Sequence, residues 1–402
     1  MLPFDDALKT VLGSVPRLEA ARVPLADAVG LVLAEDVASD VDMPPFDKSA
    51  MDGFAVVASD LAATPRTLRV VEEVPAGAVP TRRVGPGECA RIMTGAPVPQ
   101  GADAVVRVED TEAGRSPDEV VILKGVGAGA NICPRAEDVA RGSVVLRAGT
   151  LIRHLEVPTL AACGCVRVPV WRRPAVAVLS TGNEVVPPHR VPKEGQIRDA
   201  NAPYVSARVR LLGIRAEGLG IAPDEPEPLK RLLAKGLNAD VLAVTGGVSA
   251  GDFDLVPGML KELGVEVLFG SVAMQPGRPT LFGRCRDSFV FGLPGNPVSV
   301  LAAAELFLVP ALKKMMGYGG VGPPRRVARL LEPVRHRPGR LAHLPGVLEE
   351  TPDGWAVRPL PYHGSAHIHA MSRSNCLLAL PADVAALGPP ASVEVILLDR
   401  DA

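Results

Sequence analysis

The sequence predicts a multidomain fold of class α/β plus β, with a doubly wound α/β domain at its centre. After about residue 173, apolar runs alternate with amphipathic segments of about a dozen residues, which is typical of parallel strands joined by helices. On both sides of this region the pattern changes to short β-branched runs separated by Pro and Gly. A chain of 402 residues is also too long for one ordinary core, so several domains are expected.

These changes of pattern divide the chain into four predicted domains. Residues 1–45 and 140–172 are expected to form a mixed α/β domain, into which a β domain of residues 46–139 is inserted. Residues 173–322 form the predicted α/β domain, and residues 323–402 a C-terminal β domain.

The first half of the chain should begin with a helix over 4–12, because its apolar residues fall on one face and Gly13 can end it. A second helix is predicted later in this half, between short strands. In order, the expected elements are strands at 68–74, 104–108 and 119–123, a strand and turn within 142–152, and a helix at 154–163.

The α/β domain opens with a continuous apolar run at 175–179, as expected for a parallel strand buried on both faces. A helix over 202–212 should follow, with Asn201 as its N-cap, Pro203 in its first turn and Gly213 at its end. The series continues with a strand at 216–221, a helix at 226–237, a strand at 241–244, a helix at 254–263, a strand at 265–269, a strand pair within 281–291 and a helix at 298–312.

From residue 323 onward the pattern predicts strands and no helix. The basic stretch 325–340 has two interpretations, a solvated face or part of an anion pocket, and the sequence leaves both open. The expected strands are 327–331, 344–349, 355–359 and 376–380.

Charge and composition exclude several classes of function. With 43 basic and 45 acidic residues the net charge is -2, which gives no field for holding nucleic acid or an anionic membrane. Aromatic residues make up 3%, too few for a base-stacking surface. The sequence shows no signal peptide, no membrane-length apolar run and no disulfide spacing among its six Cys, so the reducing cytoplasm is expected.

Three glycine-containing turns follow predicted strands of the α/β domain, at 180–184, 245–252 and 292–297. Ligands of such sheets bind at the carboxyl ends of the strands. Glycine lets backbone N–H groups approach an anion, although a single tight turn would need glycine in any case. Three such turns on one edge indicate a phosphate-bearing ligand. The familiar P-loop ending Gly-Lys-Ser/Thr is missing, so this is not a standard nucleotide loop.

Carboxylates in turn-like segments suggest a metal site. Oxygen ligands suit Mg²⁺, which commonly binds one or two carboxylates together with substrate phosphates, although each Asp taken singly fits a turn or N-cap. A second candidate is a histidine set, since His363, His367 and His369 share strand parity with Ser365; solvated histidines are the plainer interpretation. The carboxylates in question are Asp52, Asp138, Glu184, Asp224, Asp252 and Asp254.

The chain resembles the molybdopterin molybdenumtransferase family (MoeA and the gephyrin E-domain). Residues 42–55, DMPPFDKSAMDGFA, are similar to the most specific signature of that family. Collinear matches continue along the chain: RIMTGAPVPQGADAVVRVE at 91–109, AEDVARG at 136–142, STGNE at 180–184, GQIRDAN at 195–201, TGGVSAGDFD at 245–254, PGRP at 276–279 and GLPGNPVS at 292–299.

The resemblance implies roles for particular residues. Asp52, Thr94 and Asp138 would be active-site residues of the β domain, and Glu184 would join them as a catalytic residue from the α/β pocket. Asp224 and Asp254 would bind Mg²⁺. The residues implied in substrate binding are Thr181, Gly246, Gly247, Ser249, Gln275, Arg278, Pro294, Pro297 and Ser365.

The resemblance also implies an activity, in which molybdopterin-AMP and molybdate give molybdenum cofactor and AMP. The family's architecture is a homodimer, and the resemblance places Asp52 and Asp254 of different chains in one active site. Other expected partners are the upstream adenylyltransferase and molybdoenzyme chaperones; no nucleic acid or membrane is expected. The alternatives are a molybdopterin adenylyltransferase, which shares only the α/β domain, and a gephyrin-like scaffold.

This chain departs from the family pattern where an oxyanion would bind. The family commonly has Lys where this chain has Gln275 and Arg278, and Pro345 takes the place of a family arginine. Arg278 keeps a cation and can grip an oxyanion with two hydrogen bonds, whereas Gln275 supplies no charge. Two further departures are Lys48 in place of Asn and Ala136 in place of Gly.

Overall fold

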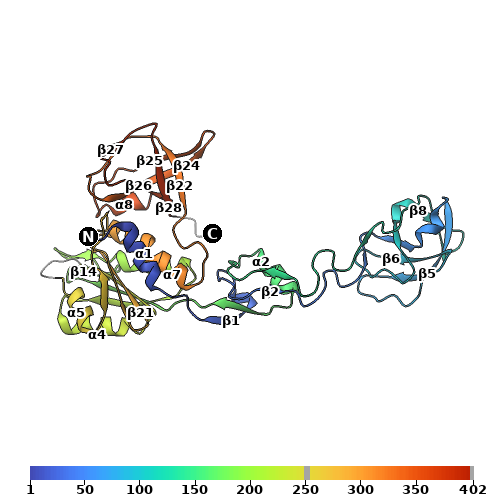
Figure 1. Cartoon of the computed structure of the whole chain (residues 1–402), viewed down its shortest axis with the longest axis horizontal. Helices are drawn as coiled ribbons and strands as arrows, with labels where there is room; N and C mark the ends of the chain where they lie inside the picture. Colours follow the sequence, from blue (N-terminus) through green and yellow to red (C-terminus); the bar gives the residue numbers. More distant parts are fainter. Residues whose placement is uncertain (249–253, 399–402) are drawn as a thin grey trace. The chain divides into compact units, whose positions relative to one another are not determined.

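The computed structural model describes residues 1–248 and 254–398. The chain forms two compact units (Figure 1). The first unit comprises Met1–Ala34, Gly149–Arg153 and Pro169–Ala402, and the second comprises Glu35–Ala148 and His154–Val168. The division is coarser than the four predicted domains, whose boundaries stay a prediction. Within the described residues, no helix has the length and apolar character needed to cross a membrane.

A six-stranded sheet with the order β7-β4-β6-β5-β9-β8 forms the main part of the second unit. Strand β5 runs parallel to β6, and the other neighbours are antiparallel. The close pairing of β4 with β7 requires Gly53, because a Cβ there would lie 1.9 Å from the Val106 carbonyl oxygen. The strands are β4 (Gly53–Val56), β5 (Arg66–Val74), β6 (Glu88–Ile92), β7 (Ala104–Arg107), β8 (Thr111–Ala113) and β9 (Glu119–Ile122).

The predicted strands of this β region are confirmed, and so is the predicted helix near residue 154. That helix is α2 (Glu156–Ala162). Two short strand pairs and two 3₁₀ helices complete the second unit. β2 (Val37–Ala38) pairs with β11 (Val144–Leu146), and β3 (Lys48–Ser49) pairs with β10 (Ile132–Cys133). The 3₁₀ helices are η2 (Ala58–Leu61) and η3 (Val108–Asp110).

The first unit contains the predicted α/β domain, built on a second six-stranded sheet of order β16-β13-β17-β21-β20-β18. The first four strands are parallel, and the last two pairings are antiparallel. Register aligns Thr245 of β17 with Ser180 of β13 and Leu293 of β21, so three carboxyl ends meet at one edge. The strands are β13 (Val176–Thr181), β16 (Ala216–Ala222), β17 (Val241–Thr245), β18 (Glu266–Phe269), β20 (Leu281–Cys285) and β21 (Ser288–Leu293).

Helices cover both faces of this sheet, as a doubly wound fold requires (Figure 1). Two of them, α4 and α5, supply the apolar cluster on one face, and the remaining helices pack in the larger cluster on the other. The helices are α1 (Phe4–Ser14), α3 (Asn201–Leu211), α4 (Pro226–Gly236), α5 (Val256–Glu262), α6 (Pro297–Ala303), the π-helix η4 (Ala304–Leu308) and α7 (Val309–Met315).

Three details of the predicted helices are wrong. The first helix runs one residue past Gly13, to Ser14. The helix expected at 298–312 is interrupted by the π-helical turn η4, which carries the buried Glu305. Asn201 is not the N-cap of α3, because Asp199 Oδ1 accepts the hydrogen bonds from the N–H groups of residues 201 and 202, at 3.0 and 3.1 Å. The Asn201 side chain instead donates to the Gly295 carbonyl at 2.7 Å.

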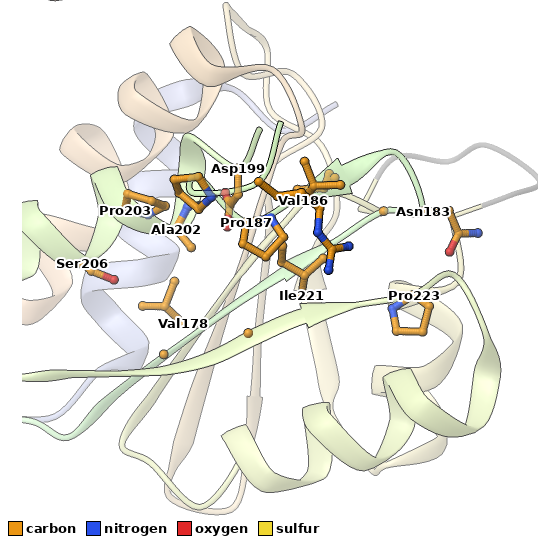
Figure 2. Close-up of a pocket in the computed structure, with 16 residues that line it drawn as sticks. Val178, Asn183, Val186, Pro187, Asp199, Ala202, Pro203, Ser206, Ile221 and Pro223 are labelled. Carbon is orange, nitrogen blue, oxygen red and sulfur yellow. Dashed lines mark hydrogen bonds between the residues drawn. The ribbon is translucent and has the colours of Figure 1, made fainter. Parts of the chain in front are cut away.

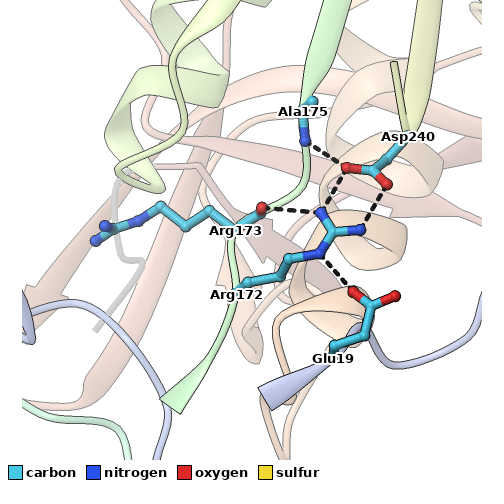
Figure 3. A network of polar contacts seen from close by, with 5 residues as sticks. All are labelled: Glu19, Arg172, Arg173, Ala175 and Asp240. Carbon is cyan, nitrogen blue, oxygen red and sulfur yellow. Dashed lines mark hydrogen bonds and ion pairs between the residues drawn. The ribbon is translucent and has the colours of Figure 1, made fainter. Parts of the chain in front are cut away.

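A network of polar side chains holds together the segments that precede β13 and β17 of the central sheet (Figure 3). Arg172 donates to both carboxylate oxygens of Asp240, at 2.7 and 2.8 Å, and to Glu19 at 2.6 Å. Asp240 also accepts from the backbone N–H of Ala175 at 2.7 Å, beside the start of β13. The hydrogen bond from Arg172 lowers the pKa of Asp240, so this carboxylate stays ionised and holds β13 beside β17.

The C-terminal part of the first unit is a closed five-stranded barrel, because β26 pairs with both β28 and β24. The barrel is joined to the α/β domain by β19 (Met274–Gln275), which pairs in parallel with the start of β24. Its strands are β22 (Arg325–Leu330), β24 (Leu341–Thr351), β25 (Gly354–Pro359), β26 (Cys376–Leu380) and β28 (Ser392–Leu397).

The prediction that no helix follows residue 323 is wrong. A short helix, α8 (Ile368–Met371), lies between β25 and β26. It forms because Ala370 and Met371 are buried, with Met371 packed in the core beneath α6. The segment is therefore not a strand, and the expected strand parity of His363, His367 and His369 is also wrong.

Shorter elements complete the described chain. They are β1 (Ala20–Pro24), η1 (Leu25–Asp27), β12 (Arg167–Trp171), β14 (Val185–Val186), β15 (Ile197–Arg198), β23 (Val334–Arg335) and β27 (Ala386–Leu387).

The buried His343 in β24 predicts an acid-sensitive fold. Burial, with a smaller contribution from Arg325, lowers the pKa of this imidazole to about 3, and its ring packs 5.4 Å from that of Phe4. Below the ordinary histidine pKa of ~6.5, His343 is protonated in the unfolded chain but stays neutral in the folded chain. The free energy of unfolding therefore falls as the pH drops. We expect the melting temperature of wild type to fall about 5 °C more than that of His343→Leu between pH 7 and pH 5.

The control for this comparison is His189→Leu, at an exposed loop position. It should follow the wild-type pH dependence. Parallel pH profiles for wild type and His343→Leu would contradict the assignment.

Candidate active site

Loops that leave the carboxyl ends of the central strands surround a pocket of about 600 Å³. We call it the carboxylate pocket, after Glu184, Asp224 and Asp254 in its wall. It brings together seven of the residues that the sequence singled out, namely Thr181, Glu184, Asp224, Gly246, Gly247, Asp254 and Pro297. Ser249 and Asp252 lie outside the described residues.

Two glycines after β17 shape this pocket. Gly246 and Gly247 have φ values of 86° and 65°, which L-residues with side chains rarely adopt. A Cβ at position 246 would lie 2.9 Å from the Thr181 carbonyl oxygen, and one at 247 would lie 2.8 Å from Thr181 Oγ1. Only glycine therefore lets the turn after β17 pass against the turn after β13.

Asp224 is held by reciprocal hydrogen bonds with Asn183. The Asn183 N–H donates to Asp224 Oδ2, and the Asp224 N–H donates to Asn183 Oδ1, both at 3.1 Å. These bonds join the loops that follow β13 and β16, two strands that lie side by side in the sheet. They fix the direction of the Asp224 carboxylate at the pocket wall.

The negative charge of the pocket is compensated only in part, because its wall carries Glu184, Asp199, Asp224 and Asp254 but, among the described residues, a single cation, Arg198. Within residues 1–248 and 254–398, the carboxylates of Glu184 and Asp254 make no hydrogen bond or ion pair. The described part of the chain holds no group of three or more His, Cys, Asp and Glu residues arranged for a metal ion. The described residues thus supply no complete protein-only metal site, but the carboxylates of the pocket fit Mg²⁺, which takes further ligands from phosphates and water.

The same finding bears on the histidines. His363 and His367 stack with their ring centroids 5.2 Å apart, but the described residues form no three-ligand set with His369. The plainer interpretation, solvated histidines, stays a prediction.

A second pocket, of about 520 Å³, lies between the α/β domain and the barrel, within the first unit. We call it the arginine pocket, after Arg278 and Arg340 in its wall. Its wall contains no Asp or Glu, and it shares Gly295 and Asn296 with the carboxylate pocket. The structure brings four residues expected from the sequence into this wall, namely Gln275, Arg278, Pro294 and Ser365.

Side-chain contacts hold this second pocket together. Asn296 Nδ2 donates to Ser365 Oγ at 2.8 Å, and the Val298 N–H donates to the Ser365 carbonyl at 3.1 Å. Ser365 comes from the segment that carries α8, so the barrel presents its hydroxyl to the turn after β21. Tyr362 also lines the pocket, and burial raises its pKa to about 12, so its hydroxyl stays protonated at neutral pH.

Gln275 and Pro345 supply no charge to the arginine pocket. The Gln275 Oε1 atom is buried, and no described residue forms a hydrogen bond with it. Pro345 is buried in β24 and does not line the pocket. The cation beside Arg278 is Arg340, from the basic stretch for which the sequence left an anion pocket open as one interpretation.

A third pocket, of about 680 Å³, adjoins the carboxylate pocket and shares Gly182, Val185 and Asp199 with it (Figure 2). Val178, Val186 and Pro187 give it apolar walls, while Asn183 and Ser206 add polar atoms at its ends. The site therefore has room for a ligand with a ring system as well as phosphate groups.

In the second unit, the structure brings Asp52 and Thr94 together. The backbone N–H and the hydroxyl of Thr94 both donate to Asp52 Oδ1 at 2.7 Å. These hydrogen bonds lower the pKa of Asp52, so its carboxylate is ionised at neutral pH. Asp138 is exposed in the loop after β10, where its N–H donates to the Met43 carbonyl at 3.0 Å. Two residues earlier, Ala136 has a φ of 60°, a conformation that glycine adopts more easily.

Sequence reasoning missed several polar residues of these pockets, among them Asn183, Asp199, Asn296 and Arg340. The first three lie inside glycine-containing or family-like motifs, so their position in those motifs was an available signal. Arg340 had only the general signal of the basic stretch around it.

Comparison with known proteins gives matches over nearly the whole chain. The model of the MoeA N-terminal region (domain I and II) matches residues 2–164, that of the "Probable molybdopterin binding domain" matches residues 177–314, and that of the MoeA C-terminal region (domain IV) matches residues 327–398. A protein named molybdopterin molybdenumtransferase from Staphylococcus aureus (strain MRSA252) is 33% identical over 406 residues, covering 100% of this chain and 96% of that protein.

Solved structures agree with these matches. A molybdopterin biosynthesis MoeA protein from Pyrococcus horikoshii superposes with a TM-score of 0.87 at 35% identity, covering 99% of each chain. A second MoeA structure from the same organism gives a TM-score of 0.81 at 32% identity, covering 99% of this chain and 100% of the other. From the relatives and the three matched regions together, this chain belongs to the MoeA family of molybdopterin molybdenumtransferases.

Proposed function

We propose that this chain inserts molybdenum into an adenylylated pterin dithiolene, so that molybdopterin-AMP and molybdate give molybdenum cofactor and AMP. The observation that carries the proposal is the pairing of two pockets of opposite charge. An arginine pocket without any carboxylate adjoins a carboxylate pocket, and the two share Gly295 and Asn296. The names of the relatives support the same reaction.

In this proposal the carboxylate pocket binds the phosphates of the substrate. Asp224 and Asp254 would hold Mg²⁺, which would neutralise the pyrophosphate and stabilise the departing AMP. Gly246 donates its own N–H to the Leu293 carbonyl at 3.0 Å, so the turn would hold a phosphate through the backbone N–H of Gly247. Glu184, which also lines this pocket, would be a catalytic residue beside the phosphates.

The arginine pocket would bind molybdate, a tetrahedral dianion. Arg278 can donate two hydrogen bonds to an oxyanion, and Ser365, fixed by Asn296 at 2.8 Å, offers its hydroxyl. Pro294 and Pro297 shape the turn between this pocket and the phosphates. The dithiolene sulfurs that bind molybdenum belong to the substrate, so the reaction needs no cysteine of the protein.

The family resemblance supports further parts of the proposal. We assign Asp52, Thr94 and Asp138 as active-site residues of the β region, where the ionised Asp52 can accept hydrogen bonds or a proton. We also propose that the chain works in the cytoplasm as a homodimer, with the upstream adenylyltransferase and molybdoenzyme chaperones as further partners. Sedimentation of the purified chain tests the dimer, and a monomer at micromolar concentration would exclude it.

The adenylyltransferase alternative is not favoured. That activity belongs to proteins that share only the α/β domain, whereas this chain also matches the MoeA N-terminal and C-terminal regions. The deciding experiment is turnover by the purified chain with molybdopterin-AMP, Mg²⁺ and molybdate. We expect one AMP released for each molybdenum inserted. AMP release that needs no molybdate, or adenylylation of molybdopterin from ATP, would contradict the proposal.

A metal requirement follows from the two aspartates. Asp254→Asn removes one anionic ligand, so we expect the Mg²⁺ concentration for half-maximal AMP release to rise about tenfold or more, with the fold intact because Asp254 lies in a loop. The measurement is AMP release across a Mg²⁺ titration, with circular dichroism for folding and Asp287→Asn, outside the pocket, as the matched control. An unchanged Mg²⁺ dependence would remove Asp254 from the metal site.

A substitution of Gln275 should improve substrate binding, whereas the substitution of Asp254 should weaken metal binding. Gln275→Lys adds a cation to the wall of the arginine pocket, so the molybdate concentration for half-maximal rate should fall about fivefold, the equivalent of ~1 kcal/mol for a partly exposed charge contact. Gln100→Lys makes the same change at an exposed position of the second unit and should leave this concentration unchanged. An unchanged or higher value for Gln275→Lys would place Gln275 away from the oxyanion.

A further inference from the structure

Helix α3 forms one wall of the third pocket, through the face that carries Ala202, Pro203 and Ser206 (Figure 2). Its first residue, Asn201, also lines the carboxylate pocket and donates to the Gly295 carbonyl at 2.7 Å. Among the described residues, none of α3 lines the arginine pocket. The position of this one helix therefore sets the shape of the third pocket and of part of the carboxylate pocket.

Tyr204 and Arg208 project from the other side of α3. Each comes two residues after a residue of the pocket wall, and two residues of an α-helix turn through about 200°. Both side chains donate to Glu305 Oε1 in η4, the Tyr204 hydroxyl at 2.8 Å and Arg208 Nε at 2.7 Å. Arg208 and Glu305 are 7% and 4% exposed, so their ion pair is buried. One carboxylate oxygen thus attaches α3 to the helical segment beside it.

The ion pair adds direction to the apolar packing of α3. Val205 and Val209 lie in the same apolar cluster as the buried side chains of α6, but such contacts have no preferred direction. A buried ion pair adds little to stability, because the loss of solvation offsets much of the attraction between the charges. Hydrogen bonds to a single carboxylate oxygen, in contrast, form only at one rotation and one height of the helix.

Glu305 lies in a π-helical turn between α6 and α7. Such turns are rare in proteins and occur frequently at functional sites. Helix α6 begins at Pro297, directly after Gly295 and Asn296, which the carboxylate and arginine pockets share. Helix α3 is therefore attached to this segment at two points, by Asn201 beside the pockets and by the Glu305 pair further along the chain.

We propose that Glu305 is a positioning residue for substrate binding. Through Tyr204 and Arg208 it holds α3 in place as a wall of the third pocket, and it acts on the ligand only through this helix. The inference rests on the proposed function for the identity of the ligand, molybdopterin-AMP. The coupling between the Glu305 pair and the pocket wall follows from the contacts of α3 alone.

The test separates the position of α3 from the stability of the fold. Glu305→Gln keeps an acceptor but removes the charge, and Tyr204→Phe removes one hydrogen bond. The double variant Arg208→Met with Glu305→Met replaces both ions by apolar side chains, a change that often restores stability. Leu233→Ala is the matched control, because it leaves a cavity under α4, in the apolar cluster on the other face of the sheet.

The melting temperature of each protein is measured first. Titration calorimetry then gives the dissociation constants for molybdopterin-AMP with Mg²⁺ and for molybdate. Each ligand is added alone, so that no molybdenum transfer takes place. Hydrogen exchange of the backbone amides compares α3 with α4.

We expect Glu305→Gln and the double variant to bind molybdopterin-AMP about tenfold more weakly than wild type, as for residues that act through an intervening element. Tyr204→Phe should weaken binding about threefold, as the loss of one hydrogen bond implies. In all three variants the amides of α3 should exchange faster and those of α4 should not. Molybdate should bind equally throughout, and Leu233→Ala should bind both ligands like wild type despite its lower melting temperature.

Wild-type affinity for molybdopterin-AMP in the double variant, together with a restored melting temperature, would overturn the inference, because the pair would then serve stability alone. So would an equal loss of affinity for molybdate, or weaker binding of either ligand by Leu233→Ala. A chain that binds molybdopterin-AMP under the control of Glu305 but transfers no molybdenum would refute the proposed function and leave this inference standing. A wild-type chain that does not bind molybdopterin-AMP would overturn both.

Discussion

The in-register parallel pairing of β13, β17 and β21 is the constraint on which both pockets depend. Because Ser180, Thr245 and Leu293 lie side by side across the sheet, the three loops that follow must share one edge. The loops therefore lie close together. Gly246 and Gly247 leave room for Thr181 because they have no side chain, and the Asn201 side chain donates a hydrogen bond to the Gly295 carbonyl. The apolar clusters on both faces of the sheet hold this register in place.

Along this edge of the sheet, carboxylates and arginines line different pockets, and this separation matches the proposed substrates. Carboxylates gather where β13, β16 and β17 end, and guanidinium groups gather where β21 meets the barrel. A phosphate ligand with Mg²⁺ fits the first group, and a dianion without metal fits the second. Gly295 and Asn296 stand between them, so both ligands would be held against one short turn.

Sequence pattern predicted the parts of this arrangement that depend on local chemistry. Apolar runs located the central strands, and the glycines of the 245–252 turn marked where the backbone approaches a neighbour closely. Local pattern also misled at α3, where Asn201 looked like an N-cap. The N-cap is Ala200, the Asp199 carboxylate accepts the hydrogen bonds of the first N–H groups, and the Asn201 amide donates to the Gly295 carbonyl, 94 residues further along the chain. Helix α8 was missed because four residues are too few to show a helical repeat of apolar side chains, and burial of Ala370 and Met371 stabilises it.

The position of Arg340 in the arginine pocket could not be predicted from the sequence. Nothing in its neighbourhood distinguishes it from Arg335 or Arg337, and only the pairing of β19 with β24 brings it beside Arg278. Such a residue is defined by a contact between elements about 65 residues apart, which no local pattern encodes. The glycine turns, in contrast, can be recognised in the sequence, because the positive φ of Gly246 and Gly247 is a backbone conformation that glycine adopts readily.

Anomalous diffraction from crystals soaked with tungstate, AMP and Mn²⁺ would test the separation of charge most directly. Tungstate has the shape and charge of molybdate, and Mn²⁺ accepts the same oxygen ligands as Mg²⁺. We predict a tungsten peak within hydrogen-bond distance of Arg278 and Arg340 and a manganese peak between Asp224 and Asp254. A tungsten peak outside the arginine pocket, or manganese bound away from both aspartates, would contradict this account.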